Sequence, residues 1–140
     1  MPVIRNTLSI GCHVITASTL SILLVLSLPA NSPAAQEGPI TATELSTRLG
    51  NDDAPLILDV RSMEEFENGH VPGALHIHYT ELPGRISELP GGRDQEIVVY
   101  CEVGVRAGIA TNVLEHAGFT RVRNLEGHMQ KWRAENYPQE

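Results

Sequence analysis

Two short apolar runs constrain the fold of this chain more than any other feature of its sequence. They are APLILDV (Ala54–Val60) and EIVVY (Glu96–Tyr100). Continuous apolar runs of this length are typical of strands that are covered on both faces, as in a parallel sheet. Because consecutive parallel strands are joined by crossover connections, which are usually helical, we expect helices around both runs.

Helical patterns do occupy the segments around these runs. Thr41–Glu44 and Ser62–Glu65 have the spacing of a capping box, and apolar residues recur at helical spacing from Arg106 until Gly118. This alternation predicts an α/β fold with a mostly parallel central sheet and helices on both faces. The remaining predicted elements are strands near 74–77 and 122–125, a helix-like segment at 80–92 that Pro83 and Gly84 interrupt, and a last amphipathic helix at 128–138.

The first 35 residues have the organisation of a targeting segment. Arg5 supplies positive charge, LSILLVLSL (Leu20–Leu28) forms an apolar core, and small residues follow Pro29. This order predicts a signal peptide at 1–35, an exported protein, and a single domain at 36–140 that makes no membrane contact after cleavage. An uncleaved membrane anchor is the alternative, although the apolar segment is short for a span of roughly 20 residues.

The charge balance narrows the class of partner. The chain has 10 lysines and arginines against 17 acidic residues, for a net charge of −7. Only Arg5 of these charged residues lies in the first 35 positions, so the rest of the chain is more acidic still. An acidic surface without a basic run argues against nucleic acid and anionic lipid as partners. Nothing in the sequence indicates an oligomeric state.

Cysteine usage is a sharper constraint. The chain has two cysteines, and Cys12 lies inside the expected signal peptide, so the exported domain would hold Cys101 alone. Exported proteins usually carry cysteines in pairs, and an unpaired one is either buried and inert or reactive. Cys101 directly follows the second apolar run, and Asp59 ends the first. Sites form beyond the carboxyl ends of parallel strands, so we expect these two residues to share one crevice.

The residues after Cys101 favour the reactive interpretation. Cys101 to Arg106 join a strand to a helix in so few residues that the loop must curl tightly, and Gly104 permits the required backbone angles. The N–H groups of residues 102–106 would then form an anion-binding nest at the positive end of the helix. Such a nest stabilises a thiolate, the nucleophilic form of cysteine, and the Arg106 side chain adds donors suited to oxyanions.

The loop and two nearby histidines also have purely structural interpretations. Cys101 could be a small buried residue that ends a core strand, with Arg106 in a surface ion pair. His76 and His78 would face the same side of a strand, but no third ligand lies nearby in sequence, so we expect no metal site.

Four motifs together give the chain a resemblance to the rhodanese-type sulfurtransferases. Beside the loop CEVGVR, they are LDVR followed by Glu65-Phe66, GHVPGA (Gly69–Ala74), and NLEGHMQKW (Asn124–Trp132), which is similar to the family ending L-x-GG-x-x-x-W. They follow the family order from about Ile40 to the C-terminus. An exported single-domain form resembles the small periplasmic rhodaneses, which implies a rhodanese-like fold and a periplasmic location.

The resemblance implies a two-step transfer without metal or organic cofactor. The Cys101 thiolate would attack the outer sulfur of thiosulfate or a related donor, and the persulfide would pass its sulfur to cyanide or a thiol. The backbone N–H groups of Glu102, Val103, Gly104, Val105 and Arg106, with the Arg106 side chain, would bind the anion. Asp59 and Arg61 would support the loops through charge-assisted hydrogen bonds, and Glu65 would be a capping-box residue and the partner of an arginine.

Two alternatives remain at this point. The domain could be a non-catalytic sulfur carrier, sensor or protein-binding module with the same fold. Tyrosine phosphatase chemistry is disfavoured, because phosphatase loops are one residue longer than the four residues, 102–105, that separate Cys101 from Arg106. The acidic Glu102 counts against strong thiosulfate turnover if its carboxylate points inward, because it would repel the donor and raise the pKa of the thiol.

Overall fold

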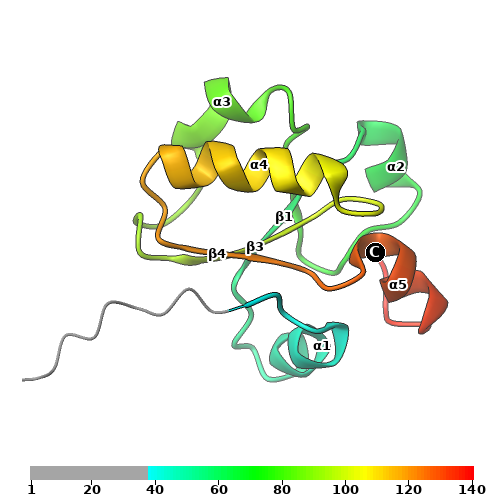
Figure 1. Ribbon diagram of the computed structural model, residues 1–140. Coiled ribbons are helices and arrows are strands. Elements are labelled where there is room, and N and C mark those ends of the chain that lie inside the picture. Colours follow the sequence, from blue (N-terminus) through cyan, green and yellow to red (C-terminus); the bar gives the residue numbers. More distant parts are fainter. Residues whose placement is uncertain (1–37) are drawn as a thin grey trace, which may run out of the picture. The chain divides into compact units, whose positions relative to one another are not determined.

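The computed structural model describes residues 38–140, and the expected signal peptide at 1–35 lies outside these residues. Strands and helices alternate along the described chain, as the apolar runs predicted (Figure 1). In order they are α1 (Ala42–Gly50), β1 (Leu56–Asp59), α2 (Met63–Glu67), β2 (Leu75–His76), α3 (Leu82–Arg85), the 3₁₀ helix η1 (Ile86–Glu88), β3 (Glu96–Tyr100), α4 (Val105–His116), β4 (Arg121–Asn124) and α5 (His128–Ala134).

The four strands form one parallel sheet in the order β2-β1-β3-β4. The two apolar runs lie at its centre, where Leu58 is in register with Val99 and Asp59 with Tyr100. This register brings the carboxyl ends of β1 and β3 to the same edge of the sheet. The expected α/β fold with a mostly parallel sheet is therefore confirmed.

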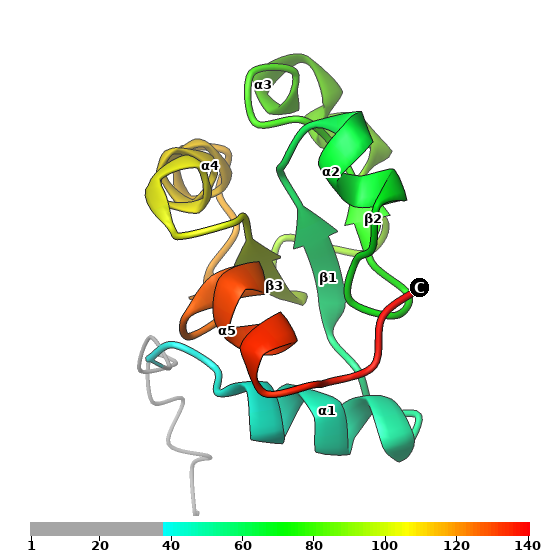
Figure 2. The ribbon, with the colours of Figure 1, turned by 90° about the vertical axis from the view of Figure 1, so that its right-hand side faces the viewer.

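Helices cover both faces of the sheet, and successive residues of β3 show why. Ile97 and Val99 pack in one core cluster with residues of α3 and α4, whereas Val98 and Tyr100 pack in a second cluster with residues of α1 and α5. Figure 1 shows α3 and α4 above the sheet and α1 below it, and Figure 2 shows α5 in front of β3. All five residues of β3 are buried, which explains the continuous apolar run.

Local signals account for the helix starts. The hydroxyl of Thr41 accepts the N–H of Glu44 (3.1 Å) at α1, and both halves of the capping box between Ser62 and Glu65 are present at α2. Pro83 and Gly84 lie within α3 instead of interrupting it. A proline in the first turn of a helix sacrifices an N–H that has no intrahelical acceptor, so it is tolerated there. Among residues 38–140, no helix combines the length and the apolar character needed to cross a membrane.

Candidate active site

Cys101 directly follows β3, where the chain turns toward α4. Its side chain belongs to the same core cluster as Ala107 of α4, and the residue is only 1% exposed. Its carbonyl oxygen accepts the N–H of Met129 (3.0 Å), and that of Glu102 accepts the N–H of Gln130 (3.1 Å). The first turn of α5 therefore holds the start of the loop. Figures 1 and 2 show this loop between α4 and α5.

The loop curls so that a backbone N–H group points at the sulfur. Gly104 has a φ of 112°, in the left-handed region that favours glycine, and its N–H donates to Sγ of Cys101 at 3.0 Å. The N–H groups at the start of α4 have no intrahelical acceptors, and they lie at the positive end of a twelve-residue helix. The side chains of Val103 and Val105 face solvent, with 60% and 73% of their surface exposed.

The guanidinium of Arg106 is shared between a carboxylate and the thiol. Its two terminal nitrogens donate to the two oxygens of Glu65 at 2.6 and 2.7 Å, which joins α4 to α2. This pair lowers the pKa of Glu65 to about 2. The pKa of Arg106 is raised, first by Glu65 and to a smaller extent by Cys101. Arg106 therefore faces the thiol with much of its charge already balanced.

Asp59 and Arg61 form a buried ion pair beside the loop. Nε of Arg61 lies 3.0 and 2.9 Å from the two oxygens of Asp59, and one terminal nitrogen donates to Asp59 (2.6 Å) and to the carbonyl of Gly69 (2.8 Å). Asp59 is fully buried, and Cys101 is nearly so. The connection of Asp59 to the loop runs through Arg61, which lies 3.7 Å from a carboxylate oxygen of Glu102.

Glu102 has two arginine partners. Its carboxylate contacts Arg133 of α5 and lies 3.7 Å from the guanidinium of Arg61. The orientation that the sequence left open is therefore set by α5 and by the buried pair below the loop. A carboxylate neutralised in this way repels an anionic ligand much less than a free one does. Residue spacing does not indicate this contact, because Arg133 lies 31 residues further along the chain than Glu102.

His128 is a second residue that the sequence analysis missed. Nδ1 of its ring accepts the backbone N–H of Cys101 at 3.4 Å, and the ring lies against the backbone of Gly104. Its backbone φ of 52° is left-handed, which is uncommon for a residue with a side chain. The sequence places it in NLEGHMQKW but does not indicate that it contacts a residue 27 positions earlier.

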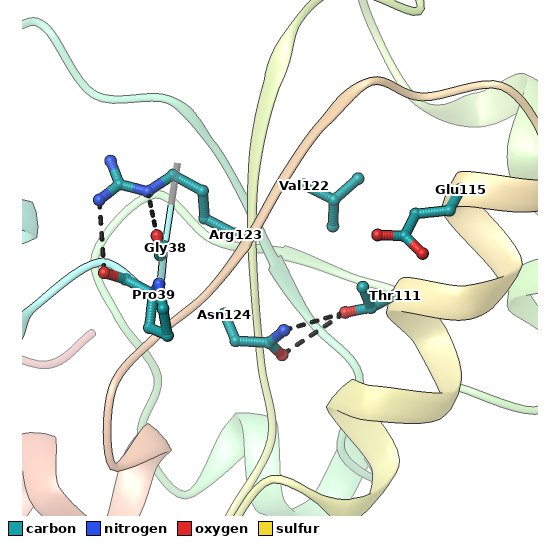
Figure 3. Close-up of a pocket in the computed structure, with 7 residues that line it drawn as sticks. All are labelled: Gly38, Pro39, Thr111, Glu115, Val122, Arg123 and Asn124. Atoms are coloured by element: carbon teal, nitrogen blue, oxygen red, sulfur yellow. Dashed lines mark hydrogen bonds between the residues drawn. The ribbon is translucent and has the colours of Figure 1, made fainter. Parts of the chain in front are cut away.

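A hollow in the protein surface lies away from the loop of Cys101. This hollow, of about 290 Å³, lies at the sheet edge, between β4, α4 and Gly38-Pro39 (Figure 3). In it, Thr111 and Asn124 are hydrogen-bonded to each other, and none of the loop residues lines it. Within residues 38–140, no group of three or more histidine, cysteine or acidic side chains could hold a metal ion.

Comparison with known proteins assigns the family. Residues 41–135 match the model of the rhodanese-like domain. A protein named sulfurtransferase from Allochromatium vinosum is 34% identical, over 71% of this chain and 91% of its own length. The putative sulfur carrier protein YrkF of Bacillus subtilis is 33% identical over 66% of this chain, which spans only 49% of that relative. The crystal structure of Alr3790 from Anabaena is similar, with a TM-score of 0.66, 32% identity, and coverage of 72% of this chain and 81% of that one. The described domain, with its cysteine loop between β3 and α4, thus belongs to the rhodanese-like family.

Proposed function

We propose that this protein is a sulfurtransferase that carries sulfur as a persulfide on Cys101. One observation carries the proposal: the sulfur of Cys101 lies at the start of α4 and accepts the N–H of Gly104 at 3.0 Å. A sulfur atom that accepts a backbone N–H at the positive end of a helix is stabilised as an anion. Membership of a family that includes named sulfurtransferases supports the same chemistry.

The first half-reaction takes sulfur from a sulfane donor such as thiosulfate. The Cys101 thiolate attacks the outer sulfur, a new S–S bond forms on Cys101, and the S–S bond of thiosulfate breaks. Sulfite leaves with the electron pair of that bond. The persulfide has the same negative charge as the thiolate that it replaces, so the N–H of Gly104 and the free N–H groups of α4 are suited to both.

The second half-reaction returns the enzyme to its starting state. An acceptor, cyanide or a thiolate, attacks the outer sulfur of the persulfide. A bond forms between the acceptor and that sulfur, the S–S bond breaks, and its electron pair leaves on the Cys101 thiolate. No proton or electron has to be supplied from elsewhere when both reactants are anions.

Steady-state kinetics test this proposal. Thiocyanate formation from thiosulfate and cyanide should give parallel lines in double-reciprocal plots, as a covalent intermediate requires. The Cys101→Ser variant should form no thiocyanate. Turnover that persists in this variant, or intersecting lines in the wild type, would contradict the persulfide cycle.

A sulfur carrier or binding module is the second candidate. The observation that favours it is the burial of Cys101, which is only 1% exposed and leaves little of the thiol open to an acceptor. The relative YrkF is named a putative sulfur carrier. A carrier would take up one sulfur from thiosulfate without releasing it to cyanide, and this outcome separates it from the enzyme.

We further propose that residues 1–35 direct export to the periplasm. The charged start, apolar core and small residues before Gln36 support this proposal. Amino-terminal sequencing of protein recovered from cells tests it. A mature chain that begins near Gln36 supports cleavage, whereas a chain that retains Leu20–Leu28 supports the anchor.

A further inference from the structure

His128 contacts both residues that define the position of the reactive sulfur. Its Nδ1 accepts the N–H of Cys101, and a Cβ atom built on Gly104 would lie 2.8 Å from its Nε2 and 3.1 Å from its Cδ2. Gly104 is the residue whose N–H donates to Sγ. The imidazole therefore lies against the backbone of the loop, in contact with both Cys101, which carries the sulfur, and Gly104, which donates a hydrogen bond to it.

The backbone of His128 has an unfavourable conformation that produces this contact. A φ of 52° is uncommon for residues with a Cβ, and such conformations concentrate at functional sites. The N–H of His128 donates to the carbonyl of Leu125 at 3.1 Å, and the following residue, Met129, donates to the carbonyl of Cys101. Both hydrogen bonds fix the turn before α5, so the side chain of residue 128 is directed at the loop.

We propose that His128 is a positioning residue of the sulfur-transfer reaction. Its neutral imidazole holds Cys101 and Gly104 in the geometry in which the N–H of Gly104 reaches the sulfur. This role rests on the proposed function for its kinetic consequences, but its effect on the thiol does not require turnover.

The hydrogen bond fixes the protonation state that this role requires. A backbone N–H can only donate, so Nδ1 must carry a lone pair, and the proton of the neutral ring is on Nε2. If the ring gains a proton, Nδ1 becomes a donor that faces another donor. The contact with Cys101 would then be lost, and the loop would be free to move away from the sulfur.

The surroundings of the ring keep it neutral. Burial lowers the pKa of His128 from its ordinary value of 6.5. Apart from the Cys101 thiolate, the charged groups on the loop and on the β4–α5 segment each have a partner of opposite charge. These ion pairs are Glu102 with Arg133, Arg106 with Glu65, and Lys131 with Glu126. Protonation of His128 is therefore expected only below pH 6.5, and the hydrogen bond from the N–H of Cys101 to its ring is intact at neutral pH.

Two substitutions separate positioning from mere packing. His128→Gly removes the ring and suits the left-handed backbone, so the fold should be retained. His128→Asn also tolerates this backbone and keeps an acceptor near the position of Nδ1, but it does not titrate. The first measurement is the pKa of Cys101, which is obtained from the absorbance of the thiolate as a function of pH. We expect a higher pKa in His128→Gly than in the wild type, and a value near that of the wild type in His128→Asn. Equal pKa values in all three proteins would overturn the proposal.

The second measurement is kcat/KM for thiosulfate against pH. We expect His128→Gly to lose about tenfold at pH 8, the scale of a slightly misplaced reactive group, and His128→Asn to recover most of that loss. The wild type should lose additional rate below pH 6.5, and His128→Asn should not. Identical acid limbs in these two proteins would overturn the role of the neutral ring. If no protein, wild type included, transfers sulfur while the pKa of Cys101 still responds to His128, the proposed function fails and the positioning role stands.

Discussion

The two ends of β3 use the same pairing of arginine with carboxylate for different purposes. At the amino end, Glu96 is 7% exposed and accepts from Arg48 at 3.0 and 2.9 Å, from Arg123 at 3.2 Å and from Arg121 at 3.5 Å. Three arginines from α1 and β4 therefore converge on one carboxylate. This cluster ties the first helix and the last strand to the middle of the sheet.

At the carboxyl end, the arginines pair with separate carboxylates, and Arg61 also lies 3.7 Å from Glu102. The pairs are Asp59 with Arg61, Glu65 with Arg106, and Glu102 with Arg133. These charges largely balance one another, and the backbone N–H of Gly104 donates to the sulfur of Cys101. An arginine beside a buried cysteine is therefore not automatically a free anion-binding group. Here the ion pairs join the loop to α2 and α5, and a backbone N–H contacts the sulfur.

The largest expected effect comes from breaking the most deeply buried pair. Asp59→Asn leaves the guanidinium of Arg61, which is 1% exposed, without its buried charged partner, and Glu102 at 3.7 Å is the carboxylate that remains. We expect the free energy of unfolding to fall by about 3 to 5 kcal/mol in chemical denaturation. Glu88→Gln is the matched control, because it removes an exposed partner of Arg85 and should leave stability unchanged. Similar losses in the two variants would show that burial does not set the value of the pair.

The cluster at the amino end should give a smaller effect on stability and none on the site. Glu96→Gln keeps the shape but removes the charge that three arginines share, so we expect a loss of about 2 kcal/mol in denaturation. The arginines lower the pKa of Glu96 from 4.5. Its stabilisation is therefore present above pH 4.5 and is lost as the pH falls through the folded pKa. The advantage of the wild type over Glu96→Gln should shrink as the pH is lowered below 4.5, and a difference that stays constant on acidification would contradict this account.

The pair of Arg106 with Glu65 tests how much charge reaches the sulfur. Arg106→Gln leaves the Glu65 carboxylate unbalanced near Cys101, so kcat/KM for thiosulfate should fall about tenfold, or ~1.4 kcal/mol. Arg106→Gln with Glu65→Gln should lose less than Arg106→Gln alone, because the repulsive carboxylate is gone. Glutamine at 65 can still cap α2, so the control keeps that helix. A double variant as impaired as Arg106→Gln alone would contradict this account, because the loss would then come from the missing Arg106 side chain and not from the unbalanced Glu65 carboxylate.

The exposed pair at the rim of the loop should give the smallest effect. Arg133→Gln removes the nearest partner of Glu102, and we expect the KM for thiosulfate to rise about threefold at low salt. The increase should shrink at high ionic strength, since it is caused by charge repulsion. Glu102→Gln in the same chain should return KM to the wild-type value. A rise in KM that persists in the double variant would show that Arg133 acts on the ligand directly.

Local patterns in the sequence predicted much of the fold. The runs Leu56–Asp59 and Glu96–Tyr100 became the central strands, since burial on both faces makes every position apolar except Asp59 and Glu96. The capping box at Ser62–Glu65 involves contacts within four consecutive residues, so the start of α2 could be predicted from the sequence alone. The two-residue strand β2 was placed only approximately, because two residues carry little periodic signal.

The site was only partly predictable for a related reason. Cys101, Gly104 and Arg106 lie within six consecutive residues, so their shared loop was visible in the sequence. The contacts that tune this loop join residues far apart in the chain. Glu65 lies 41 residues before Arg106, and His128 lies 27 residues after Cys101. Such contacts depend on how α2 and α5 pack against the loop, and residue spacing does not encode that packing.

The most direct test of the central claim is the intact mass of the purified protein after reaction with thiosulfate. We predict that the wild type gains the mass of one sulfur atom and loses it when cyanide is added. Cys101→Ser should gain nothing under the same conditions. An unchanged mass in the wild type, with thiosulfate and with other sulfane donors, would contradict a persulfide on Cys101.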